Sequence, residues 1–230
     1  MIQNPWKNLY EGPDMICAMD DKDKLKRFEL TRQTNFLKAY PQPFLGSPDA
    51  PIYLLLANPG MASEDKQKEM FDLQGATKTK LRLNLEHKCL DFPFLDNEIS
   101  PGHKWWRRVF KSYETFLEKS TPYIFSNAIA QTFFVVELVP YHSISFDSSF
   151  LGLHLPSVAY NLQLVNNAIT SNKTIIVCRS VKNWFNAVER LASYDKTYFL
   201  AKNRAIVLSD STLFPSLWQF SVEQFQLRLK

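Results

Sequence analysis

The feature that most constrains this chain is a short apolar run, Ile52–Leu56, that stops at Ala-Asn-Pro-Gly. An apolar run of this length between turn residues is typical of a strand buried on both faces of a parallel sheet. Pro59 fixes φ and removes a backbone donor, and Gly60 permits backbone conformations closed to other residues. Asn58 is therefore expected at the carboxyl end of the strand, where open α/β sheets bind ligands. The alternative is a plain Asn-Pro turn that only closes the strand.

Further apolar runs alternate with helical patterns along the rest of the chain. The predicted strands are 52–56, 133–139, 174–178 and 205–208, and the predicted helices are 20–39, 100–119, 156–169, 181–191 and one from about 221. Such alternation implies right-handed crossovers and a mainly parallel sheet. We therefore predict a single α/β domain, a three-layer α/β/α fold with a mainly parallel four-stranded sheet. A helical extension (1–50) precedes it, and a charged insertion (61–90) is either a solvated loop or a lid over the strand end.

A carboxylate interrupts the second predicted strand. Glu137 lies within the run Phe133–Pro140, where a buried carboxylate without a partner would be costly. It therefore indicates a site, or else an ion pair or a helix N-cap contact with a neighbouring element. His142 follows at the same edge of the sheet, at the start of a long polar loop that runs to Leu155.

Composition and motifs exclude several classes of protein. The chain has 230 residues, of which 45% are hydrophobic and 22% are charged, as expected for one globular domain. It has no apolar run long enough to span a membrane and no apolar signal core at its start, so we expect a cytoplasmic protein. Three scattered cysteines indicate reduced thiols, and scattered histidines argue against a zinc site. Without a Gly-rich phosphate loop or nucleophile elbow, we expect no cofactor and no metal.

Four segments together resemble the uracil-DNA glycosylase superfamily, and its mismatch-specific branch most closely. Asn-Pro-Gly-Met-Ala-Ser at 58–63 resembles the first motif of that branch. Phe-Pro-Phe at 92–94, followed by Trp-Trp at 105–106, resembles the segment that carries its base-stacking phenylalanine. Glu-Leu-Val-Pro at 137–140 lies where the branch has its middle motif, and 207–213 resembles the last motif, which inserts into the DNA minor groove. The resemblance runs from about residue 51 to 225.

The resemblance implies a monofunctional DNA glycosylase that flips a base out of double-stranded DNA and hydrolyses its N-glycosidic bond. Asn58 would position the attacking water, and Phe94 would stack on the flipped base. The residues expected to bind the substrate are Pro59, Gly60, Phe94, Glu137 and His142, and those expected to bind DNA and fill the vacated gap are Ser209, Asp210, Ser211, Thr212 and Leu213. The expected partner is DNA, bound by a monomer, with no membrane and no metal. Three cysteines are too few for the iron–sulfur branches of the superfamily.

Departures from the family pattern bear on the substrate. Leu56 replaces the glycine that usually lies two residues before the asparagine, and the last motif lacks both the histidine of the uracil enzymes and the Asn-Pro-Ser-Gly of the mismatch branch. Glu137 stands where uracil readers commonly present an amide. An ionised carboxylate only accepts hydrogen bonds, so it suits the exocyclic amine of cytosine and repels a uracil carbonyl.

We therefore expect a modified cytosine rather than uracil. The superfamily resemblance extends to bacterial defence glycosylases that remove glucosylated hydroxymethylcytosine from phage DNA, and the loop from Tyr141 to Leu155 offers room for a bulky substituent. Three alternatives remain open. They are a uracil or thymine mismatch repair glycosylase, a noncatalytic nucleic-acid-binding module of the same fold, and a small-molecule α/β enzyme such as a nucleoside hydrolase.

Overall fold

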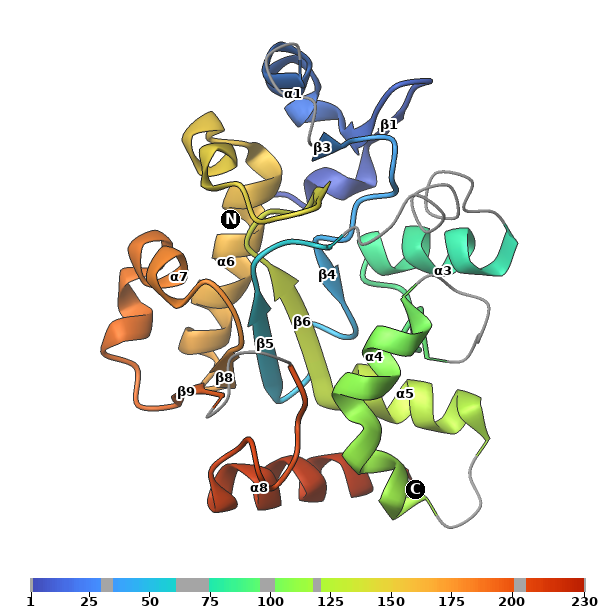
Figure 1. Ribbon diagram of the computed structural model, residues 1–230, viewed down its shortest axis with the longest axis vertical. Helices are drawn as coiled ribbons and strands as arrows, with labels where there is room; N and C mark the ends of the chain where they lie inside the picture. The colour runs from blue at the N-terminus through green and yellow to red at the C-terminus, as the bar shows by residue number, and fades with distance from the viewer. Residues whose placement is uncertain are drawn as a thin grey trace.

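The chain folds around a mixed five-stranded sheet with the strand order β4-β6-β5-β8-β9 (Figure 1). The computed structural model describes residues 2–29, 35–60, 75–95, 102–117, 121–200 and 206–229. The strands are β4 (Phe44–Leu45), β5 (Ile52–Leu56), β6 (Phe133–Glu137), β8 (Thr174–Val177) and β9 (Thr197–Phe199). Four of them run parallel, and β4 pairs antiparallel with β6 at one edge. The predicted α/β class and mainly parallel sheet are confirmed.

The predicted strand count is wrong because both edge strands are too short to leave a pattern in the sequence. Strands β4 and β9 span two and three residues, and neither forms a recognisable apolar run. The predicted fourth strand is not one over residues 206–208, and Ala205 lies outside the described residues. Ile206 and Leu208 are instead buried outside any strand. The Leu208 amide donates to the carbonyl oxygen of Val109 at 2.9 Å, so its partner is a helical residue rather than a neighbouring strand.

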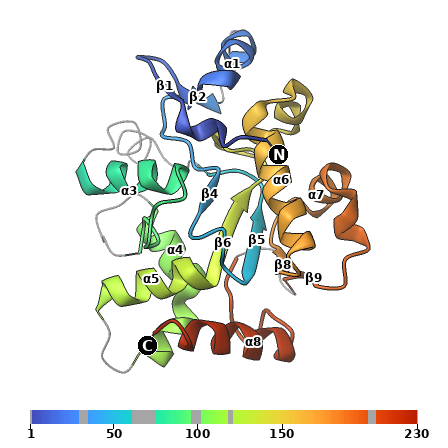
Figure 2. The same ribbon diagram turned by 180° about the vertical axis from the view of Figure 1, so that it is seen from behind.

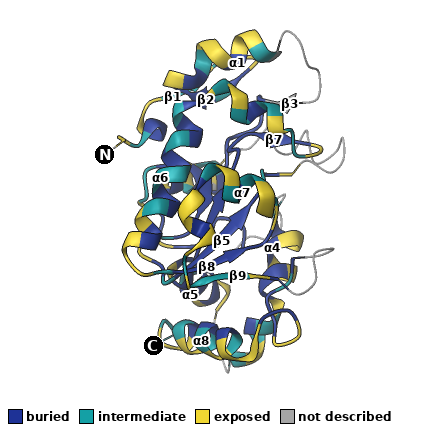
Figure 3. Cartoon of the chain, turned by 90° about the vertical axis from the view of Figure 1, so that its left-hand side faces the viewer, coloured by how far each residue is buried: buried dark blue, intermediate teal, exposed yellow. Residues whose placement is uncertain are grey.

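Helices cover both faces of the sheet and close its lower end. Figure 3 shows α6 on one side of the strands and α4 on the other, and α8 lies below the strands in every view (Figures 1 and 2). The helices are α1 (Lys22–Glu29), α3 (Gly75–Leu85), α4 (His103–Phe110), α5 (Pro122–Thr132), α6 (Pro156–Thr170), α7 (Val181–Ala187) and α8 (Pro215–Gln226). The helix predicted over 156–169 is confirmed.

Other predicted helix boundaries differ from the structure. Helix α1 covers only part of 20–39, and 35–36 form the short strand β3 instead. Helix α4 continues as a 3-10 helix over 111–116 rather than as one α-helix. Helix α8 begins at Pro215, because proline is well suited to the first turn of a helix. No helix among the described residues is long and apolar enough to cross a membrane.

The N-terminal fifty residues are more than a helical extension. A hairpin of β1 (Leu9–Glu11) and β2 (Ile16–Ala18) precedes α1, and β4 joins the central sheet. The predicted insertion over 61–90 falls partly outside the described residues, which resume at Gly75 with α3.

Strands β5 and β6 form the centre of the core, and every residue in them is buried (Figure 3). They pair in parallel, with Leu56 opposite Glu137 at their carboxyl ends. The chain that leaves β5 and the last residue of β6 therefore meet at one edge of the sheet.

Candidate functional site

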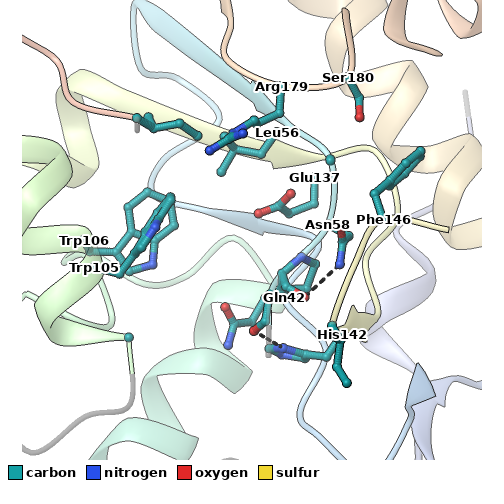
Figure 4. A pocket seen from close by; sticks show the side chains of 16 residues that line it. Gln42, Leu56, Asn58, Trp105, Trp106, Glu137, His142, Phe146, Arg179 and Ser180 are labelled. Carbon is teal, nitrogen blue, oxygen red and sulfur yellow. Dashed lines mark hydrogen bonds between the residues drawn. The ribbon is translucent and has the colours of Figure 1, made fainter. Parts of the chain in front are cut away.

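A cavity of about 670 Å³ opens at this edge, over the carboxyl ends of β5 and β6 (Figure 4). The polar side chains that line it are Gln42, Asn58, Glu137, His142, Arg179 and Ser180, and the larger apolar ones are Leu56, Trp105, Trp106, Ile144, Phe146 and Ile206. In Figure 4 the carboxyl group of Glu137 points toward the side of the cavity on which Trp105 and Trp106 lie. The volume falls in the range of small-molecule sites, and the mixture of aromatic walls with a few polar groups is typical of them.

A chain of hydrogen bonds fixes the orientation of the Asn58 amide. Its Nδ2 donates to Ser143 Oγ at 2.8 Å and to the Pro59 carbonyl oxygen at 3.0 Å. The Ser143 hydroxyl donates its only hydrogen to the Ser145 carbonyl oxygen at 2.7 Å, so its oxygen can only accept from Asn58. The amide nitrogen must therefore face Ser143. The Asn58 carbonyl oxygen, which has no hydrogen bond to the described residues, is left for a ligand or water.

Backbone contacts hold Ser143 beside the Asn-Pro-Gly turn. Strand β7 (His142–Ser143) pairs with β3, and Ser143 also forms an isolated parallel bridge to Gly60. The Ser143 amide donates to the Pro59 carbonyl oxygen at 3.3 Å. Gly60 does not use a left-handed backbone, and a Cβ placed on it would meet no atom within 4 Å. Its lack of a side chain therefore keeps space open next to Asn58, which differs from the conformational role we expected.

Glu137 is buried with an unpaired carboxyl group. The residue is only 5% exposed, and its Oε2 is buried without a hydrogen-bond partner. Its backbone amide donates to the Pro43 carbonyl oxygen at 2.9 Å, and its carbonyl oxygen accepts from Asn161 Nδ2 at 2.8 Å, so the backbone is satisfied and the side chain is not. No ion pair among the described residues ends on Glu137.

Burial raises the pKa of Glu137 well above its usual value of 4.5. The group is therefore favoured as a neutral carboxylic acid, which offers one O–H donor and one acceptor. This corrects the expectation of an ionised carboxylate that only accepts hydrogen bonds. The predicted alternative of an ion pair has no support among the described residues.

His142 lines the cavity but directs both ring nitrogens at the backbone. Nδ1 lies 3.3 Å from the Gly60 carbonyl oxygen and Nε2 lies 3.0 Å from that of Tyr40. Burial lowers the pKa of His142 to about 4, so the ring is neutral at pH 7. A neutral imidazole has one N–H, so only one of the two ring nitrogens donates to its carbonyl oxygen. The ring therefore lies between the backbone of Gly60 and that of Tyr40 and is hydrogen-bonded to one of them.

Phe94, the expected stacking residue, lies behind the cavity wall. It is 1% exposed and is not among the residues that line the cavity. A Cβ added to Gly102, which does line the cavity, would come within 3.0 Å of the Phe94 ring. The aromatic side chains that reach the cavity are Trp105, Trp106 and Phe146. Trp105 is 36% exposed and therefore lies at the rim.

The segment expected to bind DNA does not join the cavity. Residues 209–213 form a turn into α8, which lies below the strands and away from their carboxyl ends (Figure 1). The turn is closed on itself, since the Ser209 amide donates to Thr212 Oγ1 at 3.0 Å and that hydroxyl donates to the Val207 carbonyl oxygen at 2.6 Å. Leu213 is 4% exposed, whereas Asp210 and Ser211 are exposed.

Ser143 and Gln42 are among the residues that the fold brings to the site and that sequence reasoning missed. Ser143 orients Asn58 from 85 positions away, and a lone serine after a histidine carries no signal for that role. Gln42, just before β4, is 9% exposed and presents an amide to the cavity. It lies in a proline-rich segment that reads as a connection. Only the position of β4 in the sheet places Gln42 beside the carboxyl ends of β5 and β6.

The side-chain chemistry of the described residues and the comparisons with known proteins complete the description of the site. No group of three or more His, Cys, Asp or Glu there is arranged to hold a metal ion, and the three cysteines are buried and free. No protein-family model, curated protein or solved structure matches this chain. Function must therefore be argued from the cavity itself.

Proposed function

We propose that this protein is a DNA glycosylase that binds a flipped pyrimidine in the cavity and hydrolyses its N-glycosidic bond. The observation that carries the proposal is the pairing of an oriented amide with an unpaired buried carboxyl group in one cavity. Asn58 presents its carbonyl oxygen there, and Glu137 presents a neutral acid. Such a pair holds a water on one side of a bond and contacts the leaving group on the other.

Asn58 would act through placement of the water. An amide is a poor general base, so its contribution is to hold the water in line with the sugar C1′ while the base departs. The relay through Ser143 to the Ser145 carbonyl oxygen supports this role, because the amide cannot turn its nitrogen toward the water without losing two hydrogen bonds.

The cavity suits a flipped base with a substituent. An enzyme that acts on a base within a duplex must extrude it into a pocket and read its Watson–Crick edge there. Trp105, Trp106 and Phe146 offer aromatic faces for stacking. The volume of about 670 Å³ exceeds the needs of a single pyrimidine ring. We therefore favour a cytosine with a bulky group, such as glucosylated hydroxymethylcytosine of phage DNA, and a role in defence.

The neutral state of Glu137 keeps a second candidate substrate in view. A carboxylic acid can donate to N3 of cytosine while it accepts from the N4 amine. It can equally donate to O4 of uracil or thymine while it accepts from N3–H. Hydrogen bonding by Glu137 alone thus permits a uracil or thymine mismatch glycosylase as well as a cytosine glycosylase.

The test is the release of free base from a panel of duplexes that carry uracil, a thymine mismatch, 5-hydroxymethylcytosine or its glucosylated form. Wild type is expected to release one class of base, identified by mass spectrometry. Asn58→Ala should reduce the rate by about 10²-fold or more, within the range that positioning effects reach. Asn186→Ala, which removes the same amide from the exposed surface of α7, should leave the rate unchanged.

Failure to release base from every duplex would contradict the proposal. If binding to DNA persisted under that outcome, a noncatalytic nucleic-acid-binding module would be the better description. Release of a base from free nucleosides but not from DNA would favour a nucleoside hydrolase.

A further inference from the structure

Glu137 holds the only carboxyl oxygen among the described residues that is buried without a hydrogen-bond partner. A buried polar group in this state costs free energy. Seven side chains among the described residues keep such an atom, and of these seven only Glu137 lines the cavity. Glu137 lies at the end of β6, opposite Leu56 of β5, and its carboxyl group lines the cavity (Figure 4). No donor among the described residues reaches its buried Oε2.

The elements packed around Glu137 bring few ionisable groups to it. Cys178 follows the last residue of β8. Burial raises the pKa of its thiol, the nearby Glu137 adds to that rise, and Arg179 opposes it. Arg179 also lines the cavity, as does His142, whose neutral ring faces backbone carbonyl oxygens. Asn161 of α6 donates to the backbone carbonyl oxygen of Glu137 and not to its carboxyl group.

We propose that Glu137 is the catalytic acid of the reaction and donates its proton to ring N3 of a flipped cytosine as the C1′–N1 bond breaks. This inference rests on the proposed function and narrows its substrate to the cytosine class. A group that only recognises the base keeps its proton in a hydrogen bond, whereas a catalytic acid transfers that proton to the base. The carboxylate that results is then adjacent to a base that carries hydrogens on both N3 and N4.

The step balances without any co-reactant. The electron pair of the C1′–N1 bond moves to N1, and the proton from Glu137 at N3 lets the base leave as a neutral molecule. The water held by Asn58 adds its oxygen to C1′ and releases one proton to solvent. Solvent returns a proton to Glu137, so the net change is one water consumed, one C1′–OH formed and one free base released.

The chemistry of N3 explains why the substrate should be a cytosine. In cytosine N3 has a lone pair that can take a proton, and the adjacent N4 amine donates to the carboxylate that forms. In uracil and thymine N3 already carries a hydrogen, and only weakly basic carbonyl oxygens remain. The low-dielectric surroundings of Glu137 strengthen the contact between a carboxylate and a protonated base. Proton transfer therefore supplies the preference that hydrogen bonding alone does not.

A glutamine substitution distinguishes proton transfer to the base from hydrogen bonding to the base. Glu137→Gln keeps a donor and an acceptor in the same shape but cannot release a proton. With a duplex that carries glucosylated 5-hydroxymethylcytosine, the single-turnover rate of base release should fall about 10²–10³-fold, while the affinity for the duplex changes less than about threefold. Glu223→Gln, on the exposed surface of α8, should leave both quantities unchanged.

Two further readouts are specific to an acid. The wild-type rate should fall as the pH rises through the pKa of Glu137, because only the protonated form reacts, and the rate of Glu137→Gln should not show this fall. A duplex whose target base has carbon in place of N3 should react slowly with wild type, and Glu137→Gln should cause no further loss.

The outcomes distinguish the inference from the function on which it rests. If wild type releases the base and Glu137→Gln releases it at the same rate, the acid role is wrong and the glycosylase stands. If wild type releases no base from this duplex but does release uracil or thymine, the cytosine assignment and the acid role both fail. A normal melting temperature for Glu137→Gln would show that any loss is not a loss of folding.

Discussion

Two buried carboxyl groups in this protein have opposite surroundings. Asp21 is 0% exposed and Glu137 is 5% exposed. Asp21 accepts a hydrogen bond from the Tyr141 hydroxyl at 2.6 Å through Oδ2 and another from the Ser157 amide at 3.2 Å through Oδ1. Glu137 leaves Oε2 unpaired at the wall of a cavity. Burial raises the pKa of both groups, but hydrogen bonds from Ser157 and Tyr141 oppose the rise at Asp21.

The difference separates a structural carboxyl group from a functional one. Asp21 connects the N-terminal segment to Tyr141 and to the start of α6, and Tyr141 directly precedes the residues that fix the Asn58 amide. Its hydrogen bonds offset the cost of burying it. Glu137 bears that cost uncompensated, which natural proteins accept mainly at functional sites.

The largest expected effect on stability is at Asp21. Asp21→Ala leaves the Tyr141 hydroxyl and the Ser157 amide without their acceptor, which should cost about 3 kcal/mol of unfolding free energy. For a chain of this size that corresponds to a fall of about 6–12 °C in melting temperature. Thermal unfolding measures it, with the exposed neighbour in Asp20→Ala as control. Equal melting temperatures for the two variants would contradict the structural role.

Substitution of Glu137 should raise the unfolding free energy, whereas substitution of Asp21 lowers it. Its pKa is raised on folding, so the stability linked to it is complete below the unfolded pKa near 4.5 and is lost as pH rises through the folded pKa. Glu137→Gln removes this loss and should raise the unfolding free energy by about 1–2 kcal/mol at pH 9, with little change at pH 4. Denaturant unfolding at the two pH values tests this. Destabilisation of Glu137→Gln at both would mean that the carboxyl group is paired after all.

Ser143 tests whether the fixed amide matters. Ser143→Ala removes the acceptor that holds Asn58 Nδ2, so the amide can rotate, and the rate of base release should fall about tenfold, or about 1.4 kcal/mol. The matched control is Ser145→Ala, because Ser145 contributes only its backbone carbonyl oxygen. Similar losses in both variants would place the effect in the loop rather than in the amide.

The smallest expected effect concerns a half-buried base, His87, instead of an acid. Burial lowers the pKa of His87 to about 4, and its Nε2 lies 2.8 Å from the Tyr160 hydroxyl while its ring stacks on Phe44. Stability linked to this histidine is complete above pH 6.5 and is lost as pH falls toward 4. His87→Gln should reduce the loss between these values by about 1 kcal/mol. Identical pH dependence in variant and wild type would contradict the burial argument.

The central strands and the two main site residues were predictable, because long buried strands leave apolar runs that end in turn residues. Ile52–Leu56 and Asn58 are of this kind, as is Glu137, whose charge interrupts such a run. Short edge strands leave no such signal, so β4 and β9 were missed. Gln42 and Ser143 reach the cavity only through pairings between distant segments, which no local pattern encodes.

Three features of the candidate site depend on surroundings that a sequence does not report. Glu137 was expected to be ionised, and only its isolation from any partner makes the neutral acid favoured. Residues 209–213 lead into α8 and do not line the cavity, and their binding to DNA stays a prediction. The burial of Phe94 behind Gly102 likewise depends on packing across the chain.

The most direct test of the account compares two conservative substitutions in one assay. Single-turnover release of glucosylated 5-hydroxymethylcytosine would be measured for Asp21→Asn and Glu137→Gln at a temperature at which both are folded. The account predicts that Asp21→Asn keeps the wild-type rate within about threefold, whereas Glu137→Gln loses about 10²–10³-fold. A wild-type rate for Glu137→Gln, or equal losses in both variants, would contradict the claim that the unpaired carboxyl group marks the reactive site.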